Sequence, residues 1–255
     1  MFKIIFPEFR NQRYWRIHFE YVLNIFKYLK CDILYQNRAQ DFIVTIDGQD
    51  FFFDHADYTN VERKDFNLPT FKFHCLNSSN AFSPVSFGDW DQYYSLKDKL
   101  TYNGVGYLTS RQRPYAGALQ RRTDVQNLLK KHFKVQTVLL DQKLYLKEVS
   151  RILTSVFVPG YCNNMLDRAQ FQYMALGCAT ISPNLPEMLP FNQVLIPGKH
   201  YIRCKDDYSD LVDIVKGAAC EQDYLKGIGN NAKKLFEETS TPEKLGEWIA
   251  LHLKR

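Results

Sequence analysis

Four arginines are concentrated in one short part of the chain, residues 107–122; they are Arg111, Arg113, Arg121 and Arg122. The pattern predicts a strand before them and a helix after them, so they lie on the connecting loop. Guanidinium groups form bidentate hydrogen bonds with phosphate oxygens, and a diphosphate needs such donors or a metal ion. We therefore expect at least one of these arginines to contact a phosphate; the alternative is a solvated basic loop.

A second segment, residues 158–183, combines the end of an apolar strand with the start of a helix. Asn163 or Asn164 can cap that helix, and Gly177 can end it because glycine tolerates the left-handed conformation. The N–H groups at a helix N-terminus attract anions. We therefore expect this helix to begin at a ligand.

Two carboxylates and a histidine follow an apolar run in the N-terminal half, at Asp54, His55 and Asp57. Groups of these types can remove a proton from a hydroxyl. We favour Asp54 as a general base and keep Asp57 and His55 as reserves. A polar loop without a catalytic role is the alternative.

The tripeptide Asp89-Trp90-Asp91 has the D-x-D pattern that can hold Mn²⁺ or Mg²⁺ through oxygen ligands. A helix cap explains it equally well, and the six cysteines are widely spaced without a C-x-x-C pair. We therefore expect no metal site and reduced thiols.

The elements that position these residues differ between the two halves. In the N-terminal half we expect strands at 3–6 and 32–35 around a helix at 15–29. A hairpin at 42–53 turns at Asp47-Gly48, because both residues accept positive φ. Strand 71–76 and a short helix at 92–99 follow.

From residue 105 onward, strands and helices alternate to the end of the chain. The expected strands lie at 105–109, 135–140, 155–158, 179–182 and 194–196. Such alternation predicts a parallel sheet covered on both faces. We therefore expect two domains, residues 1–100 and a clearer Rossmann-like domain at 101–255.

Composition supports a folded protein, because 45% of the 255 residues are hydrophobic. The formal net charge of +5 suits an anionic small ligand as well as a nucleic acid, so charge does not choose between them. The chain carries no signal-peptide pattern and no apolar run long enough for a membrane span. We expect a soluble, cytoplasmic protein.

One stretch is familiar: Asp167-Arg168, then Gln172-Tyr-Met-Ala-Leu-Gly-Cys-Ala-Thr-Ile181. It resembles the donor-site signature of the two-Rossmann (GT-B) glycosyltransferases. The continuation at 185–191, 197–202 and 207–211 resembles most the exostosin-like and protein O-glucosyl/O-xylosyltransferase branches and the short group-1 transferases. The resemblance covers about residues 107–249.

The resemblance implies a compact α/β fold with two Rossmann-like domains and a hexosyl- or pentosyltransferase activity. Such an enzyme moves a sugar from a nucleotide-sugar, with a UDP-sugar favoured, to a hydroxyl of a glycan or protein-linked glycan. The nucleotide-sugar is a substrate, so no cofactor is expected, and arginines can replace a metal on the diphosphate.

Carried over by position, the resemblance places Asp167, Arg168, Asn163 and Asn164 near the diphosphate, and Gln172 near the ribose. Many relatives have a glutamate where this chain has Gln172. An amide can still hydrogen-bond a hydroxyl, but without the assistance of a charge.

Two other readings stay open. One is a metal-dependent GT-A transferase that uses Asp89 and Asp91. The other is a non-catalytic protein that binds nucleotides or nucleic acid through the arginine-rich segment, although acidic residues elsewhere argue against a nucleic-acid partner. We expect a bacterial or viral enzyme of the cytoplasm rather than of the Golgi lumen.

Overall fold

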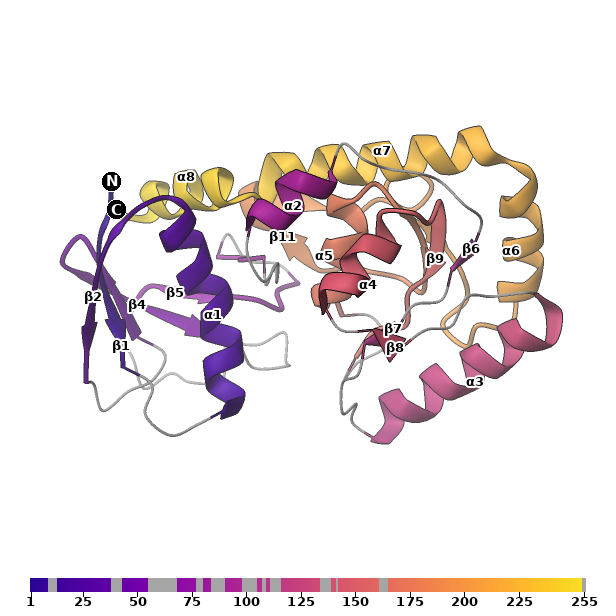
Figure 1. Ribbon diagram of the computed structural model, residues 1–255, viewed down its shortest axis with the longest axis horizontal. Helices are drawn as coiled ribbons and strands as arrows, with labels where there is room; N and C mark the ends of the chain where they lie inside the picture. The colour runs from indigo at the N-terminus through magenta and orange to yellow at the C-terminus, as the bar shows by residue number, and fades with distance from the viewer. Residues whose placement is uncertain are drawn as a thin grey trace. The chain divides into compact units, whose positions relative to one another are not determined.

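The computed structural model describes residues 1–8, 13–37, 43–54, 68–76, 80–83, 90–97, 105–106, 109–110, 116–133, 139–140, 142–160 and 165–253. Its contacts divide the chain into two units (Figure 1). Unit 1 contains Met1–Ser86, Met188–Gln193 and Glu238–Arg255, and unit 2 contains Phe87–Glu187 and Val194–Glu237. The sequence analysis divided the chain between residues 100 and 101, whereas these contacts return two later segments to unit 1.

Unit 1 is built on a five-stranded sheet in the order β2-β1-β3-β4-β5. Its strands are β1 (Lys3–Pro7), β2 (Asp32–Gln36), β3 (Ile43–Ile46), β4 (Gln49–Asp54) and β5 (Thr70–Lys72). Helix α1 (Arg13–Tyr28) connects β1 with the parallel strand β2. Strands β3 and β4 are antiparallel and turn at Asp47 and Gly48, which have φ of 49° and 85°. The predicted hairpin is confirmed.

The end of the chain completes unit 1 through α8 (Pro242–Leu253). The indole of Trp248 donates a hydrogen bond to the Ala81 carbonyl at 3.0 Å, and its ring lies 5.0 Å from that of Phe191. Phe191 lies in the short helix η1 (Pro190–Asn192), which directly follows the strand β11 (Met188–Leu189). Both elements belong to unit 1. Segments that are far apart in the sequence therefore share one core.

Unit 2 contains a fully parallel sheet in the order β13-β10-β9-β6. Its strands are β6 (Val105–Gly106), β9 (Thr154–Val156), β10 (Ala179–Ser182) and β13 (Ile202–Arg203). One short pair, β7 (Thr109–Ser110) with β8 (Leu139–Leu140), accompanies it, whereas β11 of unit 1 pairs with β12 (Gln193–Val194). The predicted parallel sheet is confirmed for the strands expected at 105–109, 155–158 and 179–182. The strands expected at 135–140 and 194–196 correspond to β8 and β12, which belong to two-stranded pairs, and the edge strand β13 was not predicted.

The helices of unit 2 are α2 (Trp90–Leu96), α3 (Ala116–His132), α4 (Gln142–Val149), α5 (Arg168–Ala175), α6 (Leu211–Cys220) and α7 (Gln222–Thr239). Figure 1 shows α4 and α5 on one side of β9 and α6 on the other. A buried cluster joins Val125 and Leu129 of α3 and Val215 of α6 to Val156 and Ile181 of the sheet. Helices therefore cover both faces, as the alternating pattern predicts.

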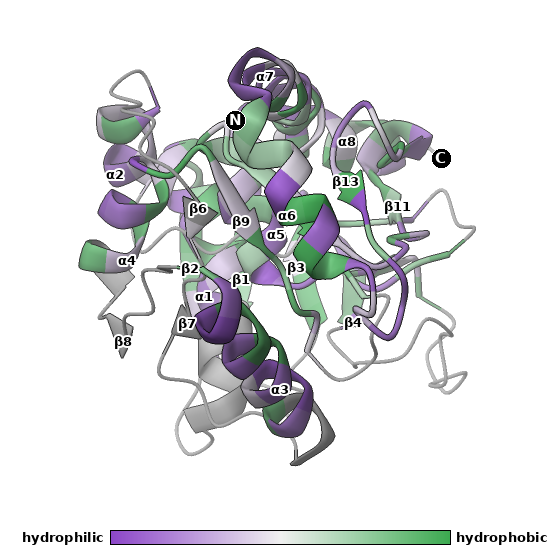
Figure 2. Cartoon of the chain, turned by 90° about the vertical axis from the view of Figure 1, so that its right-hand side faces the viewer, coloured by the Kyte–Doolittle hydropathy of each residue, from purple (hydrophilic) through white to green (hydrophobic). Residues whose placement is uncertain are grey.

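Helix α3 begins at Ala116, seven residues before the predicted start at residue 123. Alanine, leucine, glutamine and arginine are strong helix formers, so residues 118–122 extend the helix rather than a loop. Figure 2 shows both hydrophilic and hydrophobic residues along α3, and its buried residues Val125 and Leu129 pack in the core of unit 2. Arg121 and Arg122 are consequently fixed on the first turns of α3. Among the described residues, no helix is long and apolar enough to cross a membrane.

Candidate functional site

The N-terminus of α5 follows β9 at the carboxyl edge of the parallel sheet, where open α/β sheets bind ligands. Asp167 caps the helix, because its Oδ1 accepts a hydrogen bond from the Ala169 N–H at 2.8 Å. The cap is therefore neither Asn163 nor Asn164, which lie outside the described residues. Their predicted contacts with phosphate stay predictions. Gly177 ends the helix region at φ 68°, as expected.

Two of the four predicted arginines reach this edge from α3. Arg121 Nη2 donates to the Gly160 carbonyl at 2.7 Å. Arg122 donates to the Val158 carbonyl at 3.4 Å and lies 3.4 Å from Asp167 Oδ2. Neither arginine is on a loop, and both have protein acceptors.

Arg111 and Arg113 lie outside the described residues, so their predicted role is not tested. The described part of the site brings Arg122 into contact with Asp167 and Arg121 into contact with Gly160, and Arg168 follows Asp167 as the first residue of α5. Three arginines and one aspartate give this cluster a net charge of +2, from +3 and −1. A cluster of this charge suits an anionic ligand such as a diphosphate.

Helix α5 is buried on all sides beyond its first turn. Gln170 is fully buried and donates from Nε2 to the Thr180 hydroxyl at 3.0 Å. Gln172, the predicted ribose contact, is only 3% exposed, whereas Arg168 is half-buried. Arg168, expected near the diphosphate, and Gln172, expected near the ribose, therefore differ in burial, and the role of Gln172 stays a prediction.

A buried pair of tyrosines supports α5 from α4. The rings of Tyr145 and Tyr173 lie 6.4 Å apart, and both side chains are buried. Burial raises the pKa of both phenols, so they stay protonated. This pair packs α4 against α5.

Sequence reasoning missed Ser182, the last residue of β10. It is fully buried, and its hydroxyl has no hydrogen-bond partner within the described part of the chain. Buried polar atoms without partners are rare, and a bound ligand is one explanation. The signal in the sequence was its position at the carboxyl end of a predicted parallel strand.

The predicted base Asp54 is the last residue of β4 in unit 1. Its Oδ2 lies 3.3 Å from Nζ of Lys72, and both side chains are buried. Lys72 is the last residue of β5. His55 and Asp57 lie outside the described residues. The structure therefore gives Asp54 an ion-pair partner that sequence reasoning did not find, and its catalytic role is not tested.

The D-x-D tripeptide is described only in part, because Asp89 lies outside the described residues. Asp91 is exposed in the first turn of α2. Among the described residues, no group of three His, Cys, Asp or Glu side chains is placed to hold a metal ion. The five cysteines that the structure describes form no disulfide bond.

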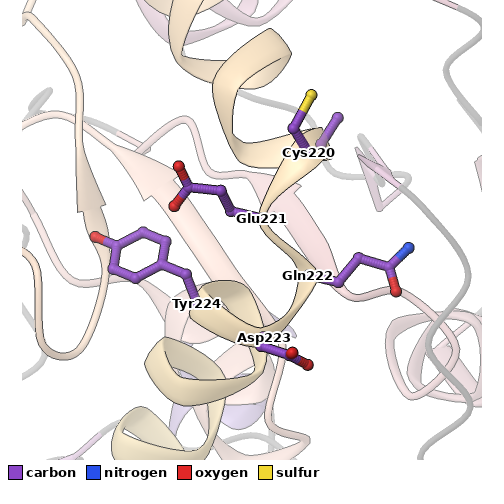
Figure 3. A pocket seen from close by; sticks show the side chains of 6 residues that line it. Cys220, Glu221, Gln222, Asp223 and Tyr224 are labelled. Atoms are coloured by element: carbon purple, nitrogen blue, oxygen red, sulfur yellow. The ribbon is translucent and has the colours of Figure 1, made fainter.

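A shallow hollow lies elsewhere on unit 2, at the junction of α6 and α7, lined by residues 219–224. Figure 3 shows the side chains of Glu221 and Gln222 pointing in different directions rather than converging. The hollow contains no predicted site residue. It is a surface depression of the helix junction and does not compete with the carboxyl edge of the sheet.

Comparison with known proteins found no matching family model and no matching curated protein. The crystal structure of a glycosyltransferase from Rickettsia africae has a TM-score of 0.52 at 11% identity, over 97% of this chain and 83% of that chain. The crystal structure of Anabaena HepE in complex with UDP has a TM-score of 0.44 at 9% identity, over 64% of this chain and 52% of that chain. The C-terminal domain of LpcC, a glycosyl transferase group 1 family protein from Francisella tularensis, has a TM-score of 0.41 at 10% identity, over 65% of this chain and 98% of that chain.

This chain thus covers 52% of the Anabaena structure, about half of its length. The Rickettsia structure, in contrast, is matched over nearly all of this chain. The likeness concerns the fold, and it does not distinguish the exostosin-like branches from the group-1 transferases. The chain has an α/β fold with a parallel sheet in unit 2 and a mixed sheet in unit 1, and this fold matches that of the Rickettsia africae glycosyltransferase structure.

Proposed function

We propose that the chain is a glycosyltransferase that moves a sugar from a nucleotide-sugar to a hydroxyl group of a glycan or protein-linked glycan. A UDP-sugar is the favoured donor, and the sugar is a hexose or a pentose. A protein of the same fold from Rickettsia africae is named a glycosyltransferase, which supports the reaction class.

One observation carries the proposal. Arg121 and Arg122 contact the segment that leads into α5, at the carboxyl edge of a parallel sheet, and Arg168 is the first residue of that helix. Phosphate groups bind at such edges because N–H groups and cations converge there.

Nucleotide binding is the first test. Titration calorimetry with UDP, GDP and their sugar conjugates should find a ligand, and that ligand should raise the melting temperature by mass action. Arg168→Ala should weaken binding by about 1.5–3 kcal/mol, the range for a hydrogen bond to a charged group. Unchanged affinity in this variant would remove Arg168 from the site.

Activity in the presence of EDTA is the second test. We propose that the arginines offset the charge of the diphosphate without a divalent cation, so transfer should persist in the chelator. Complete loss of transfer, restored by Mn²⁺, would favour the Asp89 and Asp91 alternative instead. Donor binding is measured in the same samples, because it separates a metal needed for binding from one needed for chemistry.

A further inference from the structure

The connection between β9 and α5, residues 157–167, is held at both of its described ends by neighbouring arginines of α3. On the strand side, Arg121 bonds to the Gly160 carbonyl and Arg122 to the Val158 carbonyl. On the helix side, Arg122 pairs with Asp167. One guanidinium therefore bridges a strand end and a helix start.

Two further observations show that the ends of this connection lie close together. A Cβ atom added to Gly160 would stand 3.6 Å from Asp167 Oδ2. The other oxygen of Asp167, Oδ1, accepts the Ala169 N–H. Asp167 is thus fixed by the helix through one oxygen and faces Arg122 with the other.

The geometry of the two arginines limits what they can do for a ligand. Arg121 donates from Nη2 to a carbonyl at 2.7 Å, and its Nε is buried. The Arg122 side chain is 21% exposed, and its planar fork already serves two acceptors on either side of the connection. A guanidinium has a rigid set of donors, which makes it a suitable bridge and lysine a poor substitute.

We propose that Arg121 and Arg122 are positioning residues, which hold Val158 and Gly160 beside Asp167 and so orient the first turn of α5 toward the phosphates of the nucleotide. The proposal rests on the proposed function. Arg122 acts through Asp167, whereas Arg168 is the arginine that touches the ligand. For Arg121 and Arg122, this proposal replaces the expectation of a direct contact with phosphate.

The charge of Asp167 separates positioning from direct contact. Asp167→Asn keeps a capping side chain but removes the negative charge. If Arg122 bound phosphate itself, this substitution would release it from a competing carboxylate, and UDP would bind more tightly. If Arg122 positions the loop through Asp167, the substitution should weaken UDP binding, as Arg122→Gln does.

A double-mutant cycle measured by UDP titration tests this. Each single variant, Arg122→Gln and Asp167→Asn, should weaken binding about three- to tenfold, and the double variant should be no weaker than the worse single one. In donor hydrolysis, KM should rise while kcat changes little. Glu148→Gln and Arg151→Gln remove an exposed ion pair of the same unit and should change neither quantity.

Additive losses, or tighter binding by Asp167→Asn, would overturn the proposal while leaving the proposed function intact. A wild-type protein that binds no nucleotide would overturn both, and the melting temperatures of the ligand-free variants would still report whether the bridge exists. If Arg122→Gln does not fold, Arg122→Lys takes its place, because it keeps the charge but cannot span both acceptors. Affinity restored to the wild-type value by lysine would contradict the bridge.

Discussion

Asp54 is the partner of Lys72 and the predicted general base, a group that a transferase needs if it inverts the stereochemistry of the sugar but not if it retains it. Removing one member of a buried ion pair leaves an uncompensated charge and costs about 3–5 kcal/mol. Asp54→Asn should therefore destabilise unit 1, and the double variant Asp54→Asn/Lys72→Met should recover part of the loss. Denaturant unfolding of the three proteins measures this, and strictly additive losses would contradict a coupled pair.

The catalytic duty is measured on variants that are still folded. If Asp54 is the base, turnover of Asp54→Asn falls by about 10²–10⁴ while donor affinity in unit 2 stays unchanged. Lys72→Met controls for the broken ion pair, because it removes the partner and keeps the carboxylate. Turnover that survives in Asp54→Asn would pass the role to Asp57 or His55, or indicate a retaining mechanism.

Buried thiols make the folded state sensitive to alkali. Burial raises the pKa of Cys204 from 9.0 to about 12, and it raises that of Cys178 further. Above pH 9 the unfolded chain loses these protons before the folded chain does, so stability is complete below pH 9 and falls as pH rises toward 12. The fall is about 1.4 kcal/mol per pH unit for each such thiol.

Unfolding free energy measured between pH 8 and pH 11 checks this direction, and a rise across that interval would contradict it. Cys220 is exposed and supplies an internal control for accessibility. At pH 8 a thiol reagent should label Cys220 in the native protein and leave Cys178 and Cys204 unmodified, as mass spectrometry of the peptides would show.

At the scale of elements, α7 packs on the end of α5 at a single glycine. A Cβ at Gly229 would stand 2.1 Å from the Gly177 carbonyl oxygen, too close for any real contact. Gly229→Ala should therefore push α7 off the sheet and destabilise the protein by about 1–3 kcal/mol. Thermal or denaturant unfolding of the purified variant measures the loss.

Gly227 is the matched control, because it lies on the same helix and a Cβ there meets no atom within 4 Å. Gly227→Ala should stabilise the protein by about 0.5–1 kcal/mol through helix propensity alone. Equal effects at the two positions would show that α7 does not pack as described.

Local features of these elements could be predicted from the sequence, and long-range partners could not. The Asp47-Gly48 turn and the end of α5 at Gly177 depend on the backbone preferences of the residues themselves. The Lys72 partner of Asp54 and the Asp167 partner of Arg122 depend on which strands and helices become neighbours. Periodicity specifies the type of an element more firmly than its ends, which is why α3 begins earlier than predicted.

At the scale of the whole molecule, the chain returns to unit 1 after it has built unit 2. Trp248 of α8 is 6% exposed and donates to the Ala81 carbonyl. Trp248→Ala removes that packing and should cost about 3–5 kcal/mol. Hydrogen exchange should show the loss in β1, β3 and β4, with unit 2 still protected.

Leu251 lies on the same helix but is 51% exposed. Leu251→Ala should therefore leave hydrogen exchange in unit 1 nearly unchanged. Exchange that quickens in unit 2 and not in unit 1 after Trp248→Ala would contradict the assignment of α8.

The central claim is that a nucleotide binds at the carboxyl edge of the unit 2 sheet, and a crystal structure of the protein with UDP tests it most directly. The account predicts the diphosphate at the start of α5, with Arg168 in contact and Arg121 still bonded to the Gly160 carbonyl. A diphosphate bound elsewhere, for example in the hollow between α6 and α7, would contradict it.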